Sequence, residues 1–580
     1  SLVCEGCGDC GQKSFCVSVL PKDTEFGRKR EIDQSNCNKD FSCVEGFCPS
    51  FVTVHGGKPR KGKKVNAADR LASLPAPQVR SDLSQPWNIL ITGVGGTGVV
   101  TIGALLGMAG HLEGKGSSVL DQTGLAQKGG AVTTHIRIAK SPADIHAVRI
   151  AAGEADLVLG CDMVVVNDYW VLSKIRPERS TVVMNTYEAM PGTFTTRPDM
   201  QFPAADIVKA VSTALNGEAP LQIDATHIAT ALMGDAIAAN LFMLGYAWQQ
   251  GLVPISFDAL MRAIELNGAA VEMNKTAFAW GRLAVVDLDA VVEAAGIVRN
   301  APTAAERTAL PLPMLGATNN DAGESGLTPF AADLRSEDEL RHVPASNAGE
   351  VAFLPLDDAR LSRSLDEVIA RRVAFLTAYQ NARYARRYSD LVAKVRAAET
   401  AKAPGSTDLS EAVARYFFKL MAYKDEYEVA RLYTSGEFKR RVEQQFEGDY
   451  KLHFHLAPPL LAKKNAQGQL MKQEYGSWVF TAFKVMAKLR GLRGTPLDVF
   501  GYTAERRGER ALIGEYERTI TRLLERLDAG NVDLAADIAS IPEHIRGYGH
   551  VKDAHLHKAK AREAELLKEW DNPLRVVQAA

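Results

Sequence analysis

Short apolar segments alternate with helix-like segments through the middle of the chain. Residues 88–92 form an apolar run, a glycine loop follows, and residues 99–111 have the length and composition of a helix. Further strands are expected at residues 118–120, 131–138, 157–159 and 181–185, and further helices at residues 225–249 and 256–266. Strands that alternate with helices predict an α/β domain.

The pattern changes on both sides of this domain. Residues 58–86 and 300–350 have weak apolar patterning and many Ala, Pro, Ser or Asn residues, which is typical of linkers; the second could also be a meander over the preceding domain. Helical spacing returns at residues 365–400, 410–434 and 510–528. The predicted parts are a cysteine-rich segment (1–57), a linker (58–86), an α/β domain (87–299), a linker or meander (300–350) and a mostly helical region (351–580).

Composition excludes several classes of protein. The 580 residues include 68 Lys and Arg against 69 Asp and Glu, and 46% are hydrophobic, so neither a nucleic-acid nor a membrane partner is expected. No apolar run reaches the roughly 18–20 residues of a membrane-spanning helix, and no secretory signal is present at the start. We therefore expect a cytoplasmic protein. Because Cys4 follows Ser1 almost at once, we expect the chain to be the later part of a longer product.

Seven of the eight cysteines lie between Cys4 and Cys48. A disulfide framework would favour an oxidising compartment and an even count, and neither is indicated. The spacings are C-x2-C-x2-C-x5-C and then C-x5-C-x4-C-P, which resemble the two runs C-x2-C-x2-C-x3-C-P of bacterial two-cluster ferredoxins. In such ferredoxins the last cysteine of each run binds the cluster of the other run. The segment is therefore predicted to be ferredoxin-like and to hold two [4Fe-4S] clusters.

The same pattern predicts the ligands of each cluster. The first cluster is assigned Cys4, Cys7, Cys10 and Cys48. The second is assigned Cys16, Cys37 and Cys43, with Asp40 at the position of the missing middle cysteine. Because a carboxylate binds iron more weakly than a thiolate does, the second cluster is expected to be either an Asp-ligated [4Fe-4S] centre or a labile one that yields [3Fe-4S].

Structural zinc is the alternative, but only the first run has the C-x2-C pairs that zinc sites favour. Cys161 stands alone after an apolar strand and is expected to be a buried small residue.

A glycine loop joins the first predicted strand to the first predicted helix. Gly93, Gly95, Gly96 and Gly98 satisfy G-x-G-x-x-G, a pattern that can bring a phosphate to a helix N-terminus. Asp121 ends the next predicted strand, roughly where a ribose-binding carboxylate would lie. The alternative, weighted equally, is that the glycines only permit a tight strand-to-helix turn.

Three stretches of the chain resemble the gamma domain of the pyruvate:ferredoxin oxidoreductase superfamily. They are residues 91–100, the loop Lys128-Gly129-Gly130 and the strand at residues 132–138. The resemblance is strongest to the fused bacterial indolepyruvate:ferredoxin oxidoreductases, and it extends to the cysteine segment and the helical region. It implies a Rossmann-like α/β fold in which the glycine loop and the 128–130 loop are cofactor-binding. It also implies oxidative decarboxylation of an aryl 2-oxoacid with thiamine diphosphate and Mg, coenzyme A as acyl acceptor, ferredoxin as electron acceptor, and a homodimer.

One motif of thiamine enzymes is missing. No G-D-G followed at about 25–30 residues by an Asn pair is found, and Gly234-Asp235 lies inside a helical pattern. We therefore expect the thiamine site on a preceding segment or another chain, and no turnover by this piece alone; no catalytic residue is assigned.

Two rival functions remain. One is an NAD(P)-linked iron-sulfur oxidoreductase in which Asp121 holds the ribose, and the other is a ferredoxin-like carrier fused to an assembly scaffold. Two basic clusters could meet coenzyme A or ferredoxin, although charged helix faces are commoner. They comprise Arg383, Arg386 and Arg387, and Lys439, Arg440 and Arg441.

The positions of the histidines in the sequence do not define a clear metal-binding or catalytic site. His453 and His455 could bind a metal, but their alternation with Leu and Phe reads equally well as a half-buried strand. His550, His555 and His557 are expected on the surface of a charged helix.

Overall fold

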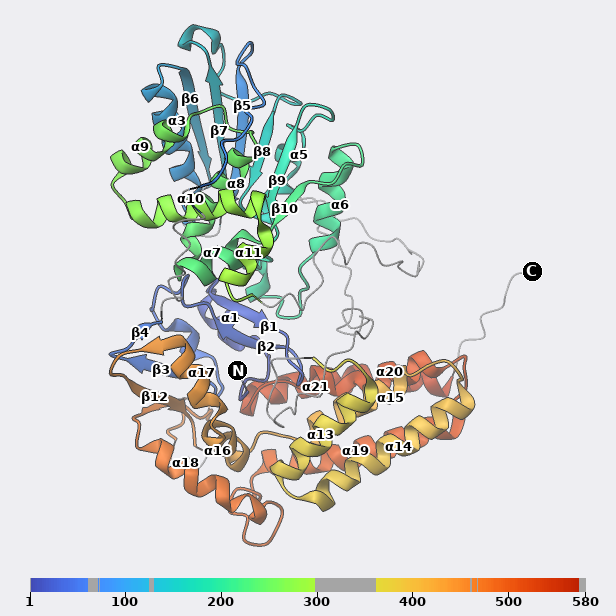
Figure 1. Ribbon diagram of the computed structural model, residues 1–580. Coiled ribbons are helices and arrows are strands. Elements are labelled where there is room, and N and C mark those ends of the chain that lie inside the picture. Colours follow the sequence, from blue (N-terminus) through green and yellow to red (C-terminus); the bar gives the residue numbers. More distant parts are fainter. Residues whose placement is uncertain are drawn as a thin grey trace, which may run out of the picture. The chain divides into compact units, whose positions relative to one another are not determined.

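The computed structural model describes residues 2–60, 71, 73–124, 130–297, 361–458, 462–466 and 468–572 (Figure 1). The chain divides into two compact units. The first, here called the cysteine–helix unit, contains Ser1–Arg60, Thr195–Pro198 and Arg335–Ala580. The second, the α/β unit, contains Lys61–Phe194 and Asp199–Leu334. The chain therefore leaves the cysteine–helix unit after its first sixty residues and returns to it later.

A six-stranded mixed sheet forms the centre of the α/β unit. Its order is β10-β9-β8-β5-β7-β6. The strands are β5 (Trp87–Val94), β6 (Gly116–Thr123), β7 (Ala131–Ala139), β8 (Leu157–Gly160), β9 (Thr181–Asn185) and β10 (Leu221–Ile223). β5, β8, β9 and β10 are parallel, whereas β7 runs antiparallel to both β5 and β6. The α/β prediction is confirmed, with a mixed sheet in which only one half has the parallel arrangement of a Rossmann fold.

Successive side chains of β5 point to opposite faces of the sheet, and both faces are buried. Ile89 and Ile91 join a core with the helices of one face, and Leu90 joins a separate core on the other. Several of the described helices contribute to the first core: α3 (Val99–Leu112), α7 (Ala225–Met233), α8 (Ala239–Gln249), α9 (Phe257–Asn267) and α10 (Val271–Val286). Residues of α4 (Met163–Val166), α5 (Tyr169–Leu172) and α6 (Ala204–Ala214) contribute to the second. Helix α11 (Leu288–Ala294) ends the described part of this unit.

The helix expected at residues 225–249 is in fact two helices. Gly234 has φ 78° and ends α7, and the Asp235 carboxylate accepts a hydrogen bond from the amide of Ile237 at 3.0 Å in the short helix η4 (Ala236–Ala238). Placing Gly234-Asp235 inside a helix was therefore wrong, because glycine here adopts the left-handed conformation that stops a helix.

The cysteine–helix unit is mostly helical after residue 361, as predicted. Its helices are α13 (Leu365–Tyr379), α14 (Ala382–Lys402), α15 (Asp408–Met421), α16 (Glu426–Thr434), α17 (Glu437–Gln445), α18 (Val479–Lys488), η6 (Leu489–Leu492), α19 (Ala504–Arg526), α20 (Val532–Ser540), η7 (Ile541–His544) and α21 (Gly549–Asp571). The single helix expected at 365–400 is broken where the Asn381 side chain caps α14 by accepting the Tyr384 amide proton at 2.9 Å.

The cysteine segment contributes small elements to the same unit. They are α1 (Asp9–Ser14), the hairpin β1 (Val19–Lys22) and β2 (Lys29–Ile32), η1 (Ser42–Glu45), β3 (Val52–His55) and β4 (Lys58–Pro59). β3 pairs with β12 (Lys451–Leu456), which pairs with β13 (Gln473–Tyr475), and β4 pairs with β11 (Phe446–Glu447). Leu2 and Val3 are buried in the core of the helices. The segment and the helical region thus share two small sheets and one core.

Two predicted regions fall wholly or partly outside the described residues: 300–350 entirely, and residues 61–70 and 72 of the first linker. Among the helices that are described, none is both long and apolar enough to cross a membrane.

Candidate functional site

Four cysteines lie near one another, one of them on α1, and they are the four that the sequence assigns to the first cluster. Burial raises the pKa of the Cys7 thiol well above its usual range, and the nearby thiols of Cys48, Cys4 and Cys10 raise it further. Cys4 and Cys10 are 8% and 7% exposed. We call Cys4, Cys7, Cys10 and Cys48 the first cysteine group.

The local backbone explains how Cys48 reaches the other three. The amide of Phe47 donates to the Asp9 carboxylate at 2.6 Å, which ties the Cys48 segment to the first turn of α1. Gly46 crosses the backbone of Cys10 so closely that an added Cβ would lie 2.7 Å from the Cys10 Cα atom. Only glycine fits this crossing without a shift of the backbone.

Buried cations surround the first cysteine group. Lys424 donates to the Cys4 carbonyl at 3.2 Å, and Lys472 donates to the carbonyls of Val44 and Gly46 at 2.6 and 2.8 Å. The pKa of Lys29 falls to about 8 through burial and the charge of Lys424, against the pull of Glu5 and Cys4. These charges can balance a negatively charged centre held by thiolates.

A second group contains Cys16, Cys37, Asp40 and Cys43. Burial raises the pKa of Cys43 to about 11, and Cys16, Cys37 and Asp40 add to the rise. The Asp40 carboxylate accepts hydrogen bonds from the amide and hydroxyl of Ser42 at 3.0 and 2.9 Å. This second cysteine group is more exposed than the first, since none of its four residues is buried.

Backbone strain concentrates at the second cysteine group. Among the described residues, seven that are not glycine have positive φ, and three of these adjoin the group: Phe15 (49°), Lys39 (60°) and Phe41 (58°). Lys39 and Phe41 flank Asp40, and Phe15 precedes Cys16. Such conformations cost on the order of 1–3 kcal/mol each and are concentrated at ligand-binding sites.

None of the eight cysteines, each in the described part of the chain, forms a disulfide. Thiols with raised pKa values stay protonated unless a cationic centre replaces their protons. Among the described residues, no group of three or more ligand atoms that all lie within 4.8 Å of one another contains a cysteine. Four thiolates on one zinc ion at about 2.3 Å would lie closer together than that.

The glycine loop turns directly from β5 into α3. Gly96 and Gly98 have φ of 85° and 94°, and a Cβ at Gly93 would lie 2.5 Å from the Val99 side chain. Helix α8 stabilises the loop, because the Asn240 side chain donates a hydrogen bond to the Thr97 carbonyl at 2.7 Å. Backbone conformation or close packing thus explains why three of the four positions are glycine, whatever the loop binds.

The loop at 128–130 approaches the glycine loop at one described point. The amide of Gly95 donates to the Gly130 carbonyl at 2.7 Å. Lys128 and Gly129 lie outside the described residues.

Asp121 does not stand where a ribose-binding carboxylate would. It lies on β6, which β7 separates from β5, and its carboxylate accepts a hydrogen bond from Thr134 at 2.6 Å. A Cβ at Gly103 of α3 would lie 3.6 Å from the same carboxylate oxygen, so the side chain is directed at that helix. The expected position was wrong because it assumed that the second strand lies beside the first.

Other predicted candidates have structural partners. Arg387 makes a bidentate ion pair with Glu517 at 2.6 and 2.7 Å, while Arg440 and Arg441 both pair with Glu437 within α17. Cys161 packs beside Gly93, and burial raises its pKa to about 12. The buried cations near the first cysteine group were not predicted, because Lys424 and Lys472 lie more than four hundred residues from Cys4.

The α/β unit defines the class of this part of the protein. Residues 88–284 match the family described as pyruvate ferredoxin/flavodoxin oxidoreductase. We call this region the gamma-like domain, after the resemblance noted in the sequence. Residues 365–565 match a family of unknown function, DUF6537.

The gamma-like domain is homologous to indolepyruvate oxidoreductase subunit IorB. The subunit from Pyrococcus horikoshii is 28% identical over 198 residues, covering 34% of this chain and 94% of the relative. The subunit from Methanothermobacter thermautotrophicus is 28% identical over 194 residues, covering 33% and 94%. Pyruvate oxidoreductase subunit PORC of Thermotoga maritima, a solved structure, is 20% identical, covers 34% of this chain and 97% of its own, and has a TM-score of 0.26.

Proposed function

We propose that this chain is the iron-sulfur and gamma-domain part of a thiamine-diphosphate-dependent indolepyruvate:ferredoxin oxidoreductase. The observation that carries the proposal is the joining of an IorB-like domain to a segment with two separate groups of cluster-type ligands. The enzyme would convert an aryl 2-oxoacid and coenzyme A to the acyl-CoA and pass electrons to ferredoxin. Thiamine diphosphate and Mg would bind to domains outside this chain, with which the gamma-like domain would associate.

The cysteine segment would conduct the electrons. Bound [4Fe-4S] clusters supply one-electron redox chemistry, and their potentials depend on ligands, charge and burial. The first cysteine group is buried beside Lys29, Lys424 and Lys472, and the second is more exposed and contains a carboxylate. These environments would give the two centres different potentials and would leave the second one more open to a soluble acceptor.

Asp40 gives this proposal its sharpest test. Anaerobically purified protein should contain iron and acid-labile sulfide for two clusters, and electron paramagnetic resonance after dithionite should show two interacting centres. Asp40→Cys should convert an altered or three-iron signal of the second centre to an ordinary [4Fe-4S] signal. Cys161→Ser is the matched control, because Cys161 belongs to neither group, and should leave iron, sulfide and signals unchanged. Zinc without sulfide would refute the electron-transfer role.

The gamma-domain role has a separate test. Ferredoxin reduction driven by indolepyruvate should require both this chain and the thiamine-binding partner segment, and should be absent with this chain alone. Reduction of NAD(P) in place of ferredoxin would favour the rival dehydrogenase.

A further inference from the structure

The sheet β13-β12-β3 has one apolar and one polar face. Phe454 pairs with Val52 on one side and Tyr475 on the other, is fully buried, and belongs to the helical core. Side chains alternate along a strand, so the neighbours of Phe454 on β12, His453 and His455, lie on the opposite face.

The register brings further polar groups to that face. Thr53 pairs with His453, and Glu474 pairs with His455. His55 lies two residues beyond Thr53 and therefore on the same face. Three strands from distant parts of the chain thus present imidazole and carboxylate groups together.

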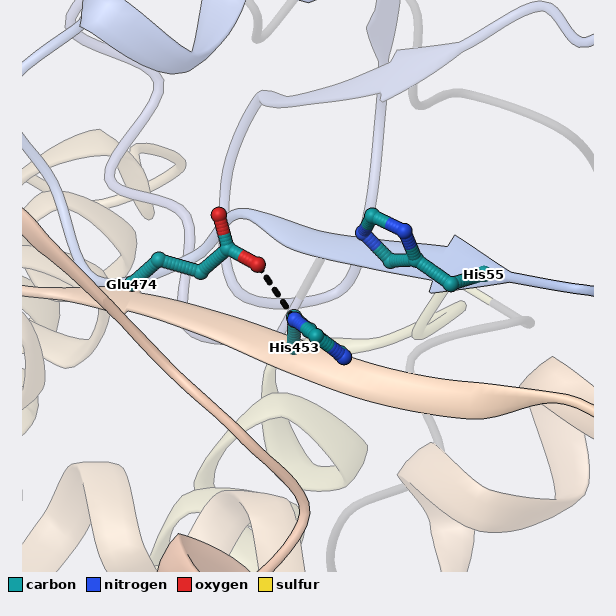
Figure 2. Close-up of side chains that lie close together, drawn as sticks. All are labelled: His55, His453 and Glu474. Carbon is teal, nitrogen blue, oxygen red and sulfur yellow. Dashed lines mark hydrogen bonds and ion pairs between the residues drawn. The ribbon is translucent and has the colours of Figure 1, made fainter.

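Three of these side chains converge. One ligand atom from each of His55, His453 and Glu474 lies within 4.8 Å of the other two, as Figure 2 shows. The His55 and His453 ring centroids are 4.2 Å apart, and His453 Nδ1 is hydrogen-bonded to the Glu474 carboxylate. Sequence analysis considered His453 with His455, but the structure pairs His453 with residues of the two flanking strands.

Thr53 orients His55 and also contacts His455, which is not part of the converging group. Its hydroxyl is hydrogen-bonded to Nε2 of His55 at 3.0 Å and to Nε2 of His455 at 3.1 Å, and Thr53 itself is 8% exposed. A hydrogen bond to one ring nitrogen fixes the tautomer and direction of a metal-binding histidine. Lys472, whose charge acts on His455, donates to the carbonyls of Val44 and Gly46 and lies over the Phe51 ring.

We propose that His55, His453 and Glu474 bind a divalent transition-metal ion of the zinc class. Two imidazoles and one carboxylate are a common donor set for zinc with an open coordination position. The three side chains reach the surface, with His453 and Glu474 28% and 49% exposed, so an ion can enter and keep a water ligand. The ion would clamp β3, which follows Cys48, to β12 and β13 of the helical region.

Zinc binding to the cluster-loaded full chain tests the proposal. We expect one zinc equivalent in equilibrium dialysis that is lost in His453→Ala and Glu474→Gln. His557→Ala is the matched control, because His557 is exposed on α21, and should keep the equivalent. Thr53→Val should keep the stoichiometry and weaken the affinity by about tenfold or more.

X-ray absorption at the zinc edge identifies the ligands directly. Nitrogen and oxygen neighbours at about 2.0–2.2 Å support the site, whereas sulfur at about 2.3 Å would assign the ion to cysteines and overturn it. Unchanged zinc content in Glu474→Gln would also overturn it. Glu474 is exposed at the edge of its sheet, so Glu474→Gln should not disturb the fold. If His453→Ala disturbs folding or iron content, the zinc content of Glu474→Gln decides whether the site exists.

Discussion

Gly46 allows the Cys48 segment to pass over Cys10, and this contact predicts a specific defect. In Gly46→Ala the new methyl group meets the Cys10 backbone at 2.7 Å, so either the first cysteine group opens or the chain shifts. We expect loss of iron from the first centre and a destabilisation of about 1–3 kcal/mol. Iron analysis and denaturant unfolding measure both effects. Gly508→Ala, at an open and exposed position in α19, should keep the iron content and should not destabilise the protein, because alanine favours a helix over glycine by about 1 kcal/mol.

Lys472 predicts a change of potential. Its charge acts on Cys48, Cys10 and Cys43, which belong to both cysteine groups. Lys472→Met should lower the reduction potentials of bound clusters by on the order of tens of millivolts, because a nearby cation stabilises the reduced, more negative state. Potentiometric titration followed by paramagnetic resonance measures the shift. Lys488→Met, exposed in α18, is the control, and equal potentials in both variants would contradict the argument.

At this scale local spacing in the sequence groups the cysteines but does not encode their surroundings. The structure places the cysteines of each group near one another, and their assignment as cluster ligands stays a prediction. The role of Lys472 depends on a contact across 426 residues, to the carbonyl of Gly46, which no local pattern encodes.

A buried histidine on strand β7, His135, predicts that the stability of the protein depends on pH. The pKa of His135 is lowered to about 4 by burial, with Arg149 and Lys174 contributing, and its Nδ1 accepts the Ile150 amide proton at 3.2 Å. The folded pKa is below the unfolded value, so between pH 6.5 and about 4 the unfolded state binds the proton more strongly and stability falls as the pH falls. We expect a loss of about 2 kcal/mol between pH 7 and pH 5.

Urea unfolding at the two pH values measures this loss. His135→Gln should remove most of the pH dependence, whatever its effect on absolute stability. His111→Gln, exposed at the end of α3, should retain it. An equal slope in both variants would show that His135 is not the responsible group.

The elements themselves were predicted where their signals were local. Residues 88–92 and 99–111 became β5 and α3 because a buried strand, a glycine turn and a helix are encoded contiguously. Sheet order is not encoded in this way, which is why Asp121 was misplaced. The alternation at residues 452–456 indicates a strand, but the pairing of β12 with β3 joins residues about 400 apart around the buried Phe454, which no local pattern encodes.

The division of the chain into two units predicts separable unfolding. Removal of iron should lower the transition of the cysteine–helix unit, which contains all the proposed ligands, and leave that of the α/β unit unchanged. Differential scanning calorimetry before and after anaerobic chelation measures this. A single transition that shifts as a whole would show that the two units unfold together.

The pairing of β3 with β12 also has a consequence for synthesis. The hydrogen bond between Thr53 and His455 spans 402 residues. At roughly 5–20 residues per second, a ribosome needs roughly 20–80 s to make the intervening chain. During that time the newly made cysteines have neither their partner strand nor the helical core that buries them. Maturation of this half of the molecule is therefore a late event, and the nascent cysteines depend on the reducing capacity of the cell or on a chaperone until translation has passed β12.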